Sequence, residues 1–126
     1  MAVQPVEDIV RAICTDKWDG QRCSASLFKG ENTSVSRLSV IPLQHHWDMF
    51  RQNVQKPPER LLALIGEINV GHLQRVGREY KQPVEITVEP APVDWNPAHA
   101  IIPQPITRGL ANQIIRGLKL HEPPRT

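Results

Sequence analysis

The chain has 126 residues, of which 40% are hydrophobic and 22% are charged, and its formal net charge is +2. These totals fit one soluble globular domain and are too small for two, while so weak a positive charge does not by itself indicate nucleic acid as the partner. The 2 cysteines, Cys14 and Cys23, exclude a disulfide framework and a zinc pattern, and no apolar run reaches the ~18 residues that a membrane-spanning helix needs.

The first third of the chain predicts one helix and two strands. After Pro5, apolar residues recur at helical spacing and predict a first helix, whose inward face is Val6, Ile9, Val10, Ile13 and Cys14. Residues 24–28 and 33–41 are rich in β-branched and alternating side chains, and the turn string KGEN separates them, so they predict two strands. Ser34 and Ser36 should share one face of the second strand.

The middle of the chain predicts two helices around a buried strand. Pro42 can begin a helix with Trp47 and Phe50 on its apolar face, and a proline pair ends it. Residues 60–68 form a nearly continuous apolar run, which predicts a strand covered on both faces. A third helix follows, capped by Asn69. Its inward residues are Val70, Leu73, Val76 and Tyr80.

The last third predicts two strands and a closing helix. Residues 83–90 alternate apolar and polar side chains, residues 99–102 predict a short strand, and residues 105–121 predict a final helix. The order of helices and strands indicates an α/β or α+β fold, as a single-domain sandwich over residues 1–121 with a mixed sheet of four to five strands and about four helices. Residues 122–126 are expected to be a disordered C-terminal end.

The N-terminal segment does not combine a charged start with a continuous apolar run, because Asp8 and Arg11 interrupt the only candidate for a signal peptide. We therefore expect a cytoplasmic protein that has no membrane partner.

The 5 histidines are the first candidates for chemistry, because imidazole titrates near neutral pH and binds metals. His45 and His46 are adjacent on the predicted helix and cannot easily bind one metal together, and no HExxH spacing occurs, so we expect no metal site and no cofactor. His46 lies beside the apolar stripe and is expected to be partly buried, whereas His45 and His72 are expected in solvent.

His99 stands in the stretch DWNPAHAIIP, where the backbone is unusually stiff. Pro97 fixes its own φ and restricts Asn96 to extended conformations, and Asn96 favours a turn. Such a turn before a strand can present a catalytic imidazole as acid or base, or a substrate ligand. A core histidine with one hydrogen bond to a carbonyl explains the frame equally well, so both alternatives stay open.

Hydroxyl and cationic side chains gather in residues 22–39. Ser36 and Arg37 are candidate ligand-binding residues, since a guanidinium offers a planar fork to a carboxylate or phosphate. The solvent-exposed face of a sheet is the simpler explanation of alternating serines. The chain contains no GxxxxGK[ST] phosphate loop and no GxSxG elbow, so a hydrolase serine has no supporting motif.

The C-terminal segment is locally basic. From residue 101 onward, four arginine and lysine residues stand against one acidic residue, whereas residues 82–101 contain three acidic residues and no arginine or lysine. Arg108, Arg116 and Lys119 lie opposite the apolar stripe of the predicted final helix, where they could dock an acidic protein or nucleic acid. A solvated helix face is the commoner explanation of this pattern, and few aromatic residues are present for stacking on bases.

Three segments together resemble a group of small bacterial proteins of uncharacterised function. SVSRLSV, GEINVGHL and NPAHAII followed by ANQII match an LSV-type strand, an NVG-type segment and an NPxHA-type turn before a final helix. The resemblance spans most of residues 34–115 and implies a role, with no reaction assigned, for Ser36, Arg37, Asn69 and His99. It also implies a component encoded beside larger bacterial systems, including genome-defence loci.

Three classes of function follow. The first is an accessory or protein-interaction module of a bacterial multi-gene system, which binds a protein partner through a sheet edge or the basic final helix. The second is a small enzyme with His99 as acid, base or substrate ligand and Arg37 as anion anchor, and the third is a nucleic-acid-binding adaptor. The sequence favours the first class, because it does not show a complete set of catalytic residues. The enzyme hypothesis requires His99 to meet Arg37, Ser36 or Asn69 in one pocket.

Overall fold

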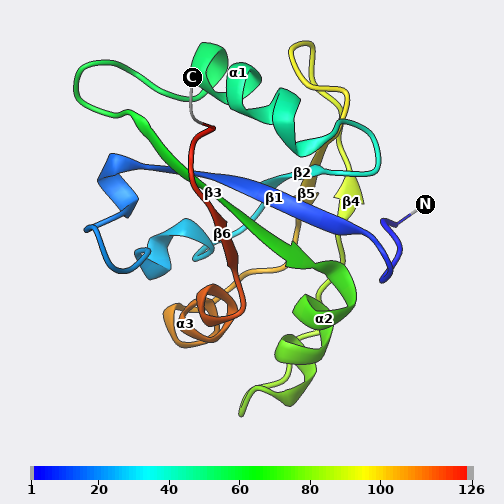
Figure 1. Ribbon diagram of the computed structural model, residues 1–126. Coiled ribbons are helices and arrows are strands. Elements are labelled where there is room, and N and C mark those ends of the chain that lie inside the picture. Colours follow the sequence, from blue (N-terminus) through cyan, green and yellow to red (C-terminus); the bar gives the residue numbers. More distant parts are fainter. Residues whose placement is uncertain (1, 125–126) are drawn as a thin grey trace.

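The computed structural model of the protein describes residues 2–124, and Figure 1 shows its strands and helices. The elements, in which η marks a 3₁₀ helix, are β1 (Asp8–Cys14), η1 (Thr15–Lys17), η2 (Ala25–Leu27), β2 (Thr33–Arg37), α1 (Leu43–Asn53), β3 (Leu62–Asn69), α2 (Val70–Glu79), β4 (Glu89–Pro90), β5 (His99–Ile102), α3 (Arg108–Arg116) and β6 (Lys119–His121).

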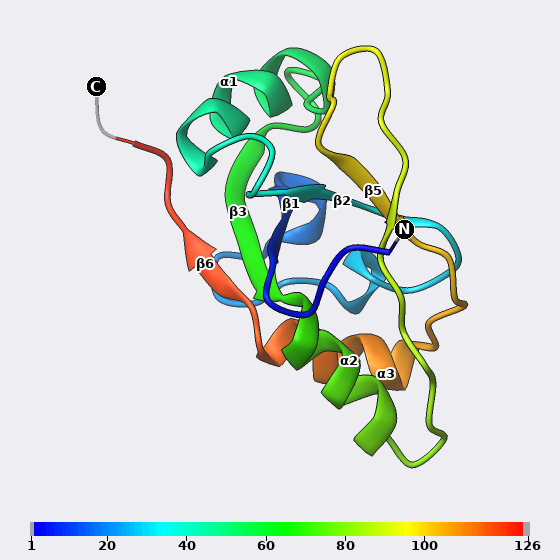
Figure 2. The ribbon, with the colours of Figure 1, turned by 90° about the vertical axis from the view of Figure 1, so that its right-hand side faces the viewer.

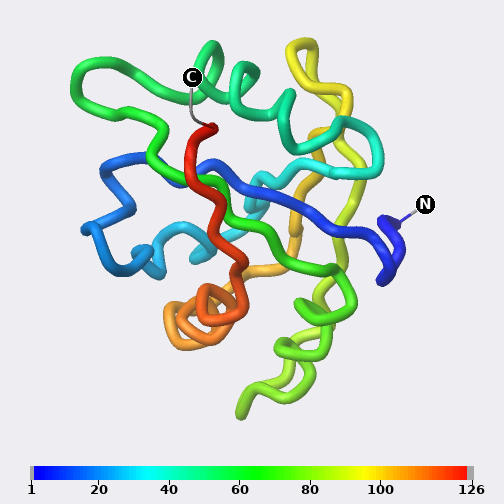
Figure 3. Tube along the Cα trace, viewed as in Figure 1, coloured from blue at the N-terminus to red at the C-terminus, as the bar shows by residue number. Residues whose placement is uncertain are grey.

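The strands form one open 6-stranded sheet in the order β4-β5-β2-β1-β3-β6, and all neighbours are antiparallel. β1 pairs with β3 along its whole length, and the chain returns late to place β6 beside β3 (Figure 3). Residues 2–124 therefore form an α+β domain with an all-antiparallel sheet and three α-helices. The predicted mixed sheet with four to five strands and about four helices is wrong in these details. No parallel crossover joins the described strands, and residues 8–14 and 119–121, predicted as helix, are strands.

The first predicted helix is wrong, since residues 8–14 are the strand β1. Ile9 and Ile13 are buried on one face of the sheet, and Val10 is buried on the other. A segment that is apolar on both sides satisfies the helical and the strand spacing alike. Pairing with β3 decides between them, because it buries both faces and satisfies the backbone hydrogen bonds.

Two other predicted elements also differ, one in kind and one at its end. Residues 24–28 hold the 3₁₀ helix η2 in place of a strand, since the side chain of Ser24 accepts a hydrogen bond from the amide of Ser26 and caps it. The final helix stops at Gly117, and residues 119–121 become the strand β6 instead of its last turn.

Residues 83–90 keep the predicted inward alternation but pair as a strand only at Glu89 and Pro90. Ile86 and Val88 are buried, as predicted. Their segment stays outside the ladder because other groups take its amides, such as the Gln104 side chain, which accepts from Thr87 at 2.9 Å. Prolines in this segment also lack the donor that a ladder needs.

The predicted strand of residues 33–41 is present as β2 but ends at Arg37, and the other predicted elements are confirmed as α1, β3, α2 and β5. Asn69 caps α2 as predicted, since its side-chain oxygen accepts a hydrogen bond from the His72 amide at 3.0 Å. His46 is buried and His45 is exposed, which follows the predicted amphipathic pattern of α1.

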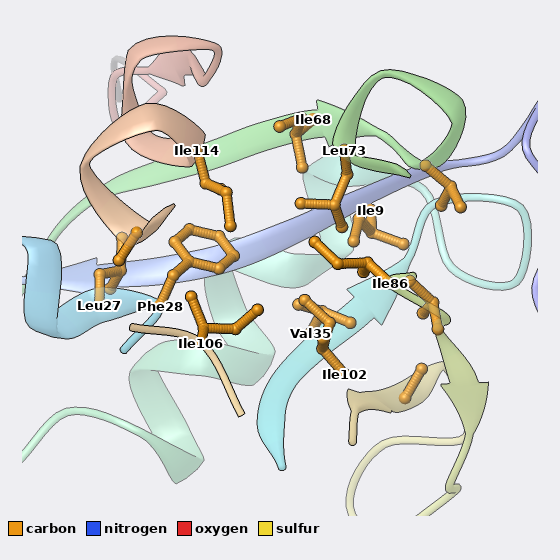
Figure 4. Packing of buried hydrophobic residues seen from close by; sticks show 14 of the residues in the cluster. Ile9, Leu27, Phe28, Val35, Ile68, Leu73, Ile86, Ile102, Ile106 and Ile114 are labelled. Atoms are coloured by element: carbon orange, nitrogen blue, oxygen red, sulfur yellow. The ribbon is translucent and has the colours of Figure 1, made fainter. Parts of the chain in front are cut away.

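Two hydrophobic clusters lie on opposite faces of the sheet. The larger cluster joins the sheet to α2 and α3, and Figure 4 shows part of it, including Ile9, Val35, Ile68, Leu73 and Ile114. The smaller cluster lies under α1 and consists of Val10, Trp47, Phe50 and Ile65. Figure 2 shows α1 on one side of the sheet and the two other helices on the opposite side.

The sheet is split between β1 and β2. These strands pair at only two positions, Ile9 with Arg37 and Val10 with Ser36. Beyond Val10 they separate, and the side chain of Arg11 bridges the gap. The split leaves a hollow on the face of the sheet that carries α1.

Within residues 2–124, no helix has the length and apolar character that crossing a membrane requires. Residues 122–124 of the predicted disordered end carry no helix or strand, and residues 125–126 lie outside the described residues.

Candidate functional site

The hollow at the split is a cleft of about 340 Å³, a size at the lower end of small-molecule sites. Its floor comes from β1, β2 and β5, and its walls from the C-terminal end of α1, Arg60 and Trp95. We call it the sheet cleft and define it by its main polar residues, which are Arg11, Ser34, Ser36, Arg60, Asn96 and His99.

Arg11 stands where the two strands separate. Its Nε donates to the carbonyl oxygen of Leu27 at 2.6 Å, and its Nη1 donates to the carbonyl oxygen of Ser34 at 2.7 Å. Burial lowers the pKa of the Arg11 guanidinium from its ordinary value, yet a guanidinium stays protonated at neutral pH. Among residues 2–124, no acidic side chain forms an ion pair with it.

Arg60 supplies a second guanidinium to the sheet cleft. Its Nη2 donates to the carbonyl oxygen of Val54 at 2.9 Å, but its Nε is buried and has no hydrogen-bond partner in the described part of the chain. Leaving a buried donor unpaired costs about 1–3 kcal/mol, and more when the group is charged. Arg60 therefore lines the cleft and carries one unsatisfied N–H group, for which an acceptor would be favourable.

The surroundings of both guanidinium groups are apolar and mildly basic. Phe50, Val54 and Trp95 line the cleft, and Lys17 and Asp16 are the other charged side chains in its lining. The three cations thus exceed the one carboxylate, which makes the cleft favourable for an anion.

Ser36 lines the floor of the cleft and belongs to a buried hydrogen-bond network with His46 and Asn96. Its Oγ lies 2.6 Å from Nε2 of His46 and accepts a hydrogen bond from Nδ2 of Asn96 at 3.0 Å. Nδ1 of His46 lies 3.1 Å from the carbonyl oxygen of Pro42, which can only accept, so Nδ1 carries the proton. Burial lowers the pKa of His46, so the ring is neutral and its Nε2 accepts from the Ser36 hydroxyl.

A second serine–histidine pair lies two residues away on the same face of β2. Nε2 of His99 is 3.1 Å from Oγ of Ser34, and Nδ1 of His99 is 2.7 Å from the carbonyl oxygen of Ala91. The carbonyl again fixes the proton on Nδ1, so in the neutral ring Nε2 accepts from the Ser34 hydroxyl. Ser34 is exposed and His99 is half-buried, so this pair is open to the cleft.

The structure brings together only part of the predicted site. His99 and Ser36 line the same cleft, whereas Arg37 and Asn69 do not. Arg37 donates two hydrogen bonds of 3.0 Å to Glu7, and Asn69 caps α2. The hydrogen bonds from Arg37, assisted by one from Ser39, lower the pKa of Glu7 to about 2.

The basic residues predicted on the final helix lie away from the sheet cleft. Arg108 and Arg116 are exposed on α3, and Lys119 is exposed on β6 because the helix has already ended. Arg116 also lines an open hollow of about 590 Å³ beside α2 and α3.

Sequence reasoning missed Arg11, Arg60 and Ser34. Arg11 carried a usable signal, because it is a cation between Ile9 and Ile13 in an otherwise apolar segment. Arg60 gave no signal, since its environment depends on how the loop after α1 folds back.

Within residues 2–124, no three histidine, cysteine or acidic side chains gather closely enough to hold a metal ion. The chain is thus an α+β domain with an open antiparallel sheet and a basic cleft where the sheet splits. Comparison with protein-family models, curated proteins and solved structures finds no match.

Proposed function

We propose that the protein binds a small organic anion in the sheet cleft. The observation that carries the proposal is the pair of guanidinium groups, Arg11 and Arg60, which line one cleft and form no ion pair with any acidic side chain of residues 2–124. A cation removed from water is costly unless a counter-charge reaches it, so an anionic ligand would lower the free energy of both groups.

The ligand has an anionic group and an apolar part. A carboxylate or a phosphate fits the planar N–H donors of a guanidinium, and Phe50 and Trp95 offer aromatic surface to the remainder. The sequence suggested Arg37 as the anion-binding residue, but its guanidinium is already paired with Glu7. Arg11 and Arg60 take this role in the proposal.

The hypotheses of a protein partner and of a nucleic-acid partner stay predictions. Their candidate residues, Arg108, Arg116 and Lys119, are exposed, which is a necessary condition for either role. A ligand-binding accessory module of a bacterial multi-gene system is compatible with the same cleft.

The test is a titration with benzoate, phenyl phosphate, inorganic phosphate and the neutral analogue benzyl alcohol, followed by backbone amide NMR. We expect saturable shifts at cleft residues with benzoate or phenyl phosphate, and none with benzyl alcohol. Benzoate against phenyl phosphate tells a carboxylate site from a phosphate site, and inorganic phosphate tests whether the apolar part is needed. If none of the four saturates up to about 10 mM, where binding provides less than ~3 kcal/mol, the proposal is wrong.

A matched pair of variants localises the binding. Arg60→Gln removes the unpaired donor and should weaken binding about tenfold. Arg75→Gln removes a cation that is 64% exposed on α2 and should leave the affinity unchanged. Equal weakening in both variants would show a diffuse charge effect and contradict the proposed site.

A further inference from the structure

We propose that Ser34 and His99 form a nucleophile–base pair that hydrolyses small anionic carboxylic esters in the sheet cleft. The inference rests on the proposed anion binding, and it adds a reaction to it. It starts from the hydrogen bonds of His99, which fix the direction of a proton.

The imidazole of His99 is held in the tautomer that a general base needs. Its Nδ1 donates to the Ala91 carbonyl oxygen at 2.7 Å, so the lone pair of the neutral ring lies on Nε2. The Oγ of Ser34 is 3.1 Å from Nε2, within the reach of a proton transfer. The Ser34 proton therefore already points at the base that would remove it.

The cleft gives a substrate access to this hydroxyl. Ser34 is exposed, lines the cleft, and lies on the face of β2 opposite the buried Val35. By contrast, Ser36 is 2% exposed and its hydrogen bonds are already satisfied by His46 and Asn96. Of the two pairs, only the one with His99 combines a base with an accessible hydroxyl.

Positive charge is close to the same residue. Nη1 of Arg11 donates to the carbonyl oxygen of Ser34 at 2.7 Å, so the guanidinium lies beside the residue that carries the nucleophile. N–H groups of Arg11 beyond its two bonds to carbonyl oxygens have no hydrogen bond to the described residues. A cation there favours the negative charge that develops when an ester carbonyl is attacked.

The reaction balances with water as the only co-reactant. Ser34 Oγ bonds to the acyl carbon while its proton moves to His99 Nε2, and the ester C–O bond breaks as that proton passes to the leaving alcohol. Water then attacks the acyl–serine and gives a proton to Nε2, which returns it to Ser34 as the carboxylic acid leaves. The substrate class is an ester whose acyl part carries a carboxylate for Arg60, because that guanidinium lines the same cleft.

The experiment compares mono-p-nitrophenyl glutarate, which is anionic, with neutral p-nitrophenyl acetate. Release of p-nitrophenol is followed by absorbance, and the acylated residue is identified by peptide mass mapping. We expect hydrolysis of the anionic ester, with acyl–Ser34 detected during turnover and a rate that falls about 100-fold or more in Ser34→Ala and His99→Gln. Ser26→Ala and His45→Gln change an exposed serine and an exposed histidine elsewhere and should keep the wild-type rate.

A further variant protects the test against misfolding. Ser34→Cys retains a nucleophile next to His99 and should still be acylated at position 34, even though Ser34→Ala is not. A wild-type rate in Ser34→Ala, acylation at another residue, or no acylation at all would overturn the inference.

The outcome also separates this inference from the proposed function. Binding of benzoate or phenyl phosphate without Ser34-dependent hydrolysis would overturn the reaction and leave the anion site intact. Ser34-dependent hydrolysis that is equal for both esters and unchanged in Arg60→Gln would support the nucleophile–base pair and overturn the anion site.

Discussion

The two serine–histidine pairs of β2 have the same hydrogen-bond polarity and opposite surroundings. In each, a backbone carbonyl holds the proton on Nδ1, so the serine hydroxyl donates to Nε2. Ser36 and His46 are buried, whereas Ser34 is exposed and His99 is half-buried in the sheet cleft. Burial therefore gives the two pairs different roles. The Ser36–His46 pair stabilises the fold, whereas the Ser34–His99 pair is accessible to a ligand.

The buried pair joins three parts of the fold. His46 belongs to α1, Ser36 to β2, and Asn96 to the turn before β5. A fully hydrogen-bonded network of this kind specifies one arrangement, because each member would be unsatisfied in any other. The open pair joins β2 to β5 with fewer partners, so its loss should be tolerated.

The largest expected effect comes from removing the two imidazoles in turn. His46→Ala should lower the free energy of unfolding by about 2–4 kcal/mol, because it opens a cavity and leaves Ser36 and Asn96 short of a partner. His99→Ala should cost less than about 1.5 kcal/mol, since solvent reaches its site. Urea unfolding measures both values, and equal losses would contradict the assignment of the two pairs.

The partly buried ion pair of Glu7 and Arg37 gives the next largest effect. Glu7→Gln breaks the ion pair with Arg37, whose side chains are 13% and 25% exposed, and should cost about 1–2 kcal/mol at neutral pH after screening by solvent. Because the folded pKa of Glu7 lies at about 2, below the usual 4.5, its contribution is full above pH 4.5 and is lost as the pH falls toward 2. The free energy of unfolding, measured from pH 2 to pH 7, should fall less steeply below pH 4.5 in the variant than in the wild type. An equally steep fall in both would show that Glu7 is not the cause of this pH dependence.

The buried imidazole should impose its own pH dependence at higher pH. Burial lowers the pKa of His46 in the folded protein below the usual 6.5, so the unfolded chain binds the proton more readily. Stability is therefore complete above pH 6.5 and declines as the pH falls from there toward the folded pKa. His46→Gln should remove this decline while His99→Gln keeps it, as urea unfolding between pH 5 and pH 8 can show.

The smallest expected effect concerns the hydroxyls. Ser34→Ala should change the free energy of unfolding by no more than about 0.5 kcal/mol, because the side chain is exposed. Ser36→Ala should cost about 1–2 kcal/mol, because it strips a buried partner from His46 and Asn96. Thermal unfolding of the two variants side by side should show the lower midpoint for Ser36→Ala. A lower midpoint for Ser34→Ala would contradict the assignment of the two pairs.

Sequence patterns predicted the parts of the fold where one spacing dominates. Residues 60–68 predicted a buried strand, which is present as β3. The Asn69 cap followed by apolar residues at helical spacing predicted a helix, which is present as α2. β1 was mistaken for a helix because an apolar segment buried on both faces fits either period, and only its distant partner β3 decides. β6 was missed for the same reason, since its partner lies far earlier in the chain.

The candidate site was predictable only where the backbone itself carried a signal. The prolines around Asn96 marked His99, and the structure places that imidazole against the cleft. Arg11 stood out only as a cation in an apolar segment, and Arg60 gave no signal. The partners of both are carbonyl groups brought near by the split in the sheet and by a loop. Arg37 looked equally suitable in the sequence, but Glu7, thirty positions away, occupies it.

The most direct test of the central claim observes the side chain of Arg60 itself. Its Nε–H resonance, assigned in a ¹⁵N-labelled protein by comparison with Arg60→Gln, is followed while benzoate or phenyl phosphate is added. The account predicts that this resonance shifts and saturates together with the backbone amides of the sheet cleft, as the unpaired donor gains an acceptor. An Arg60 Nε–H signal that stays in place while the ligand saturates elsewhere would contradict it.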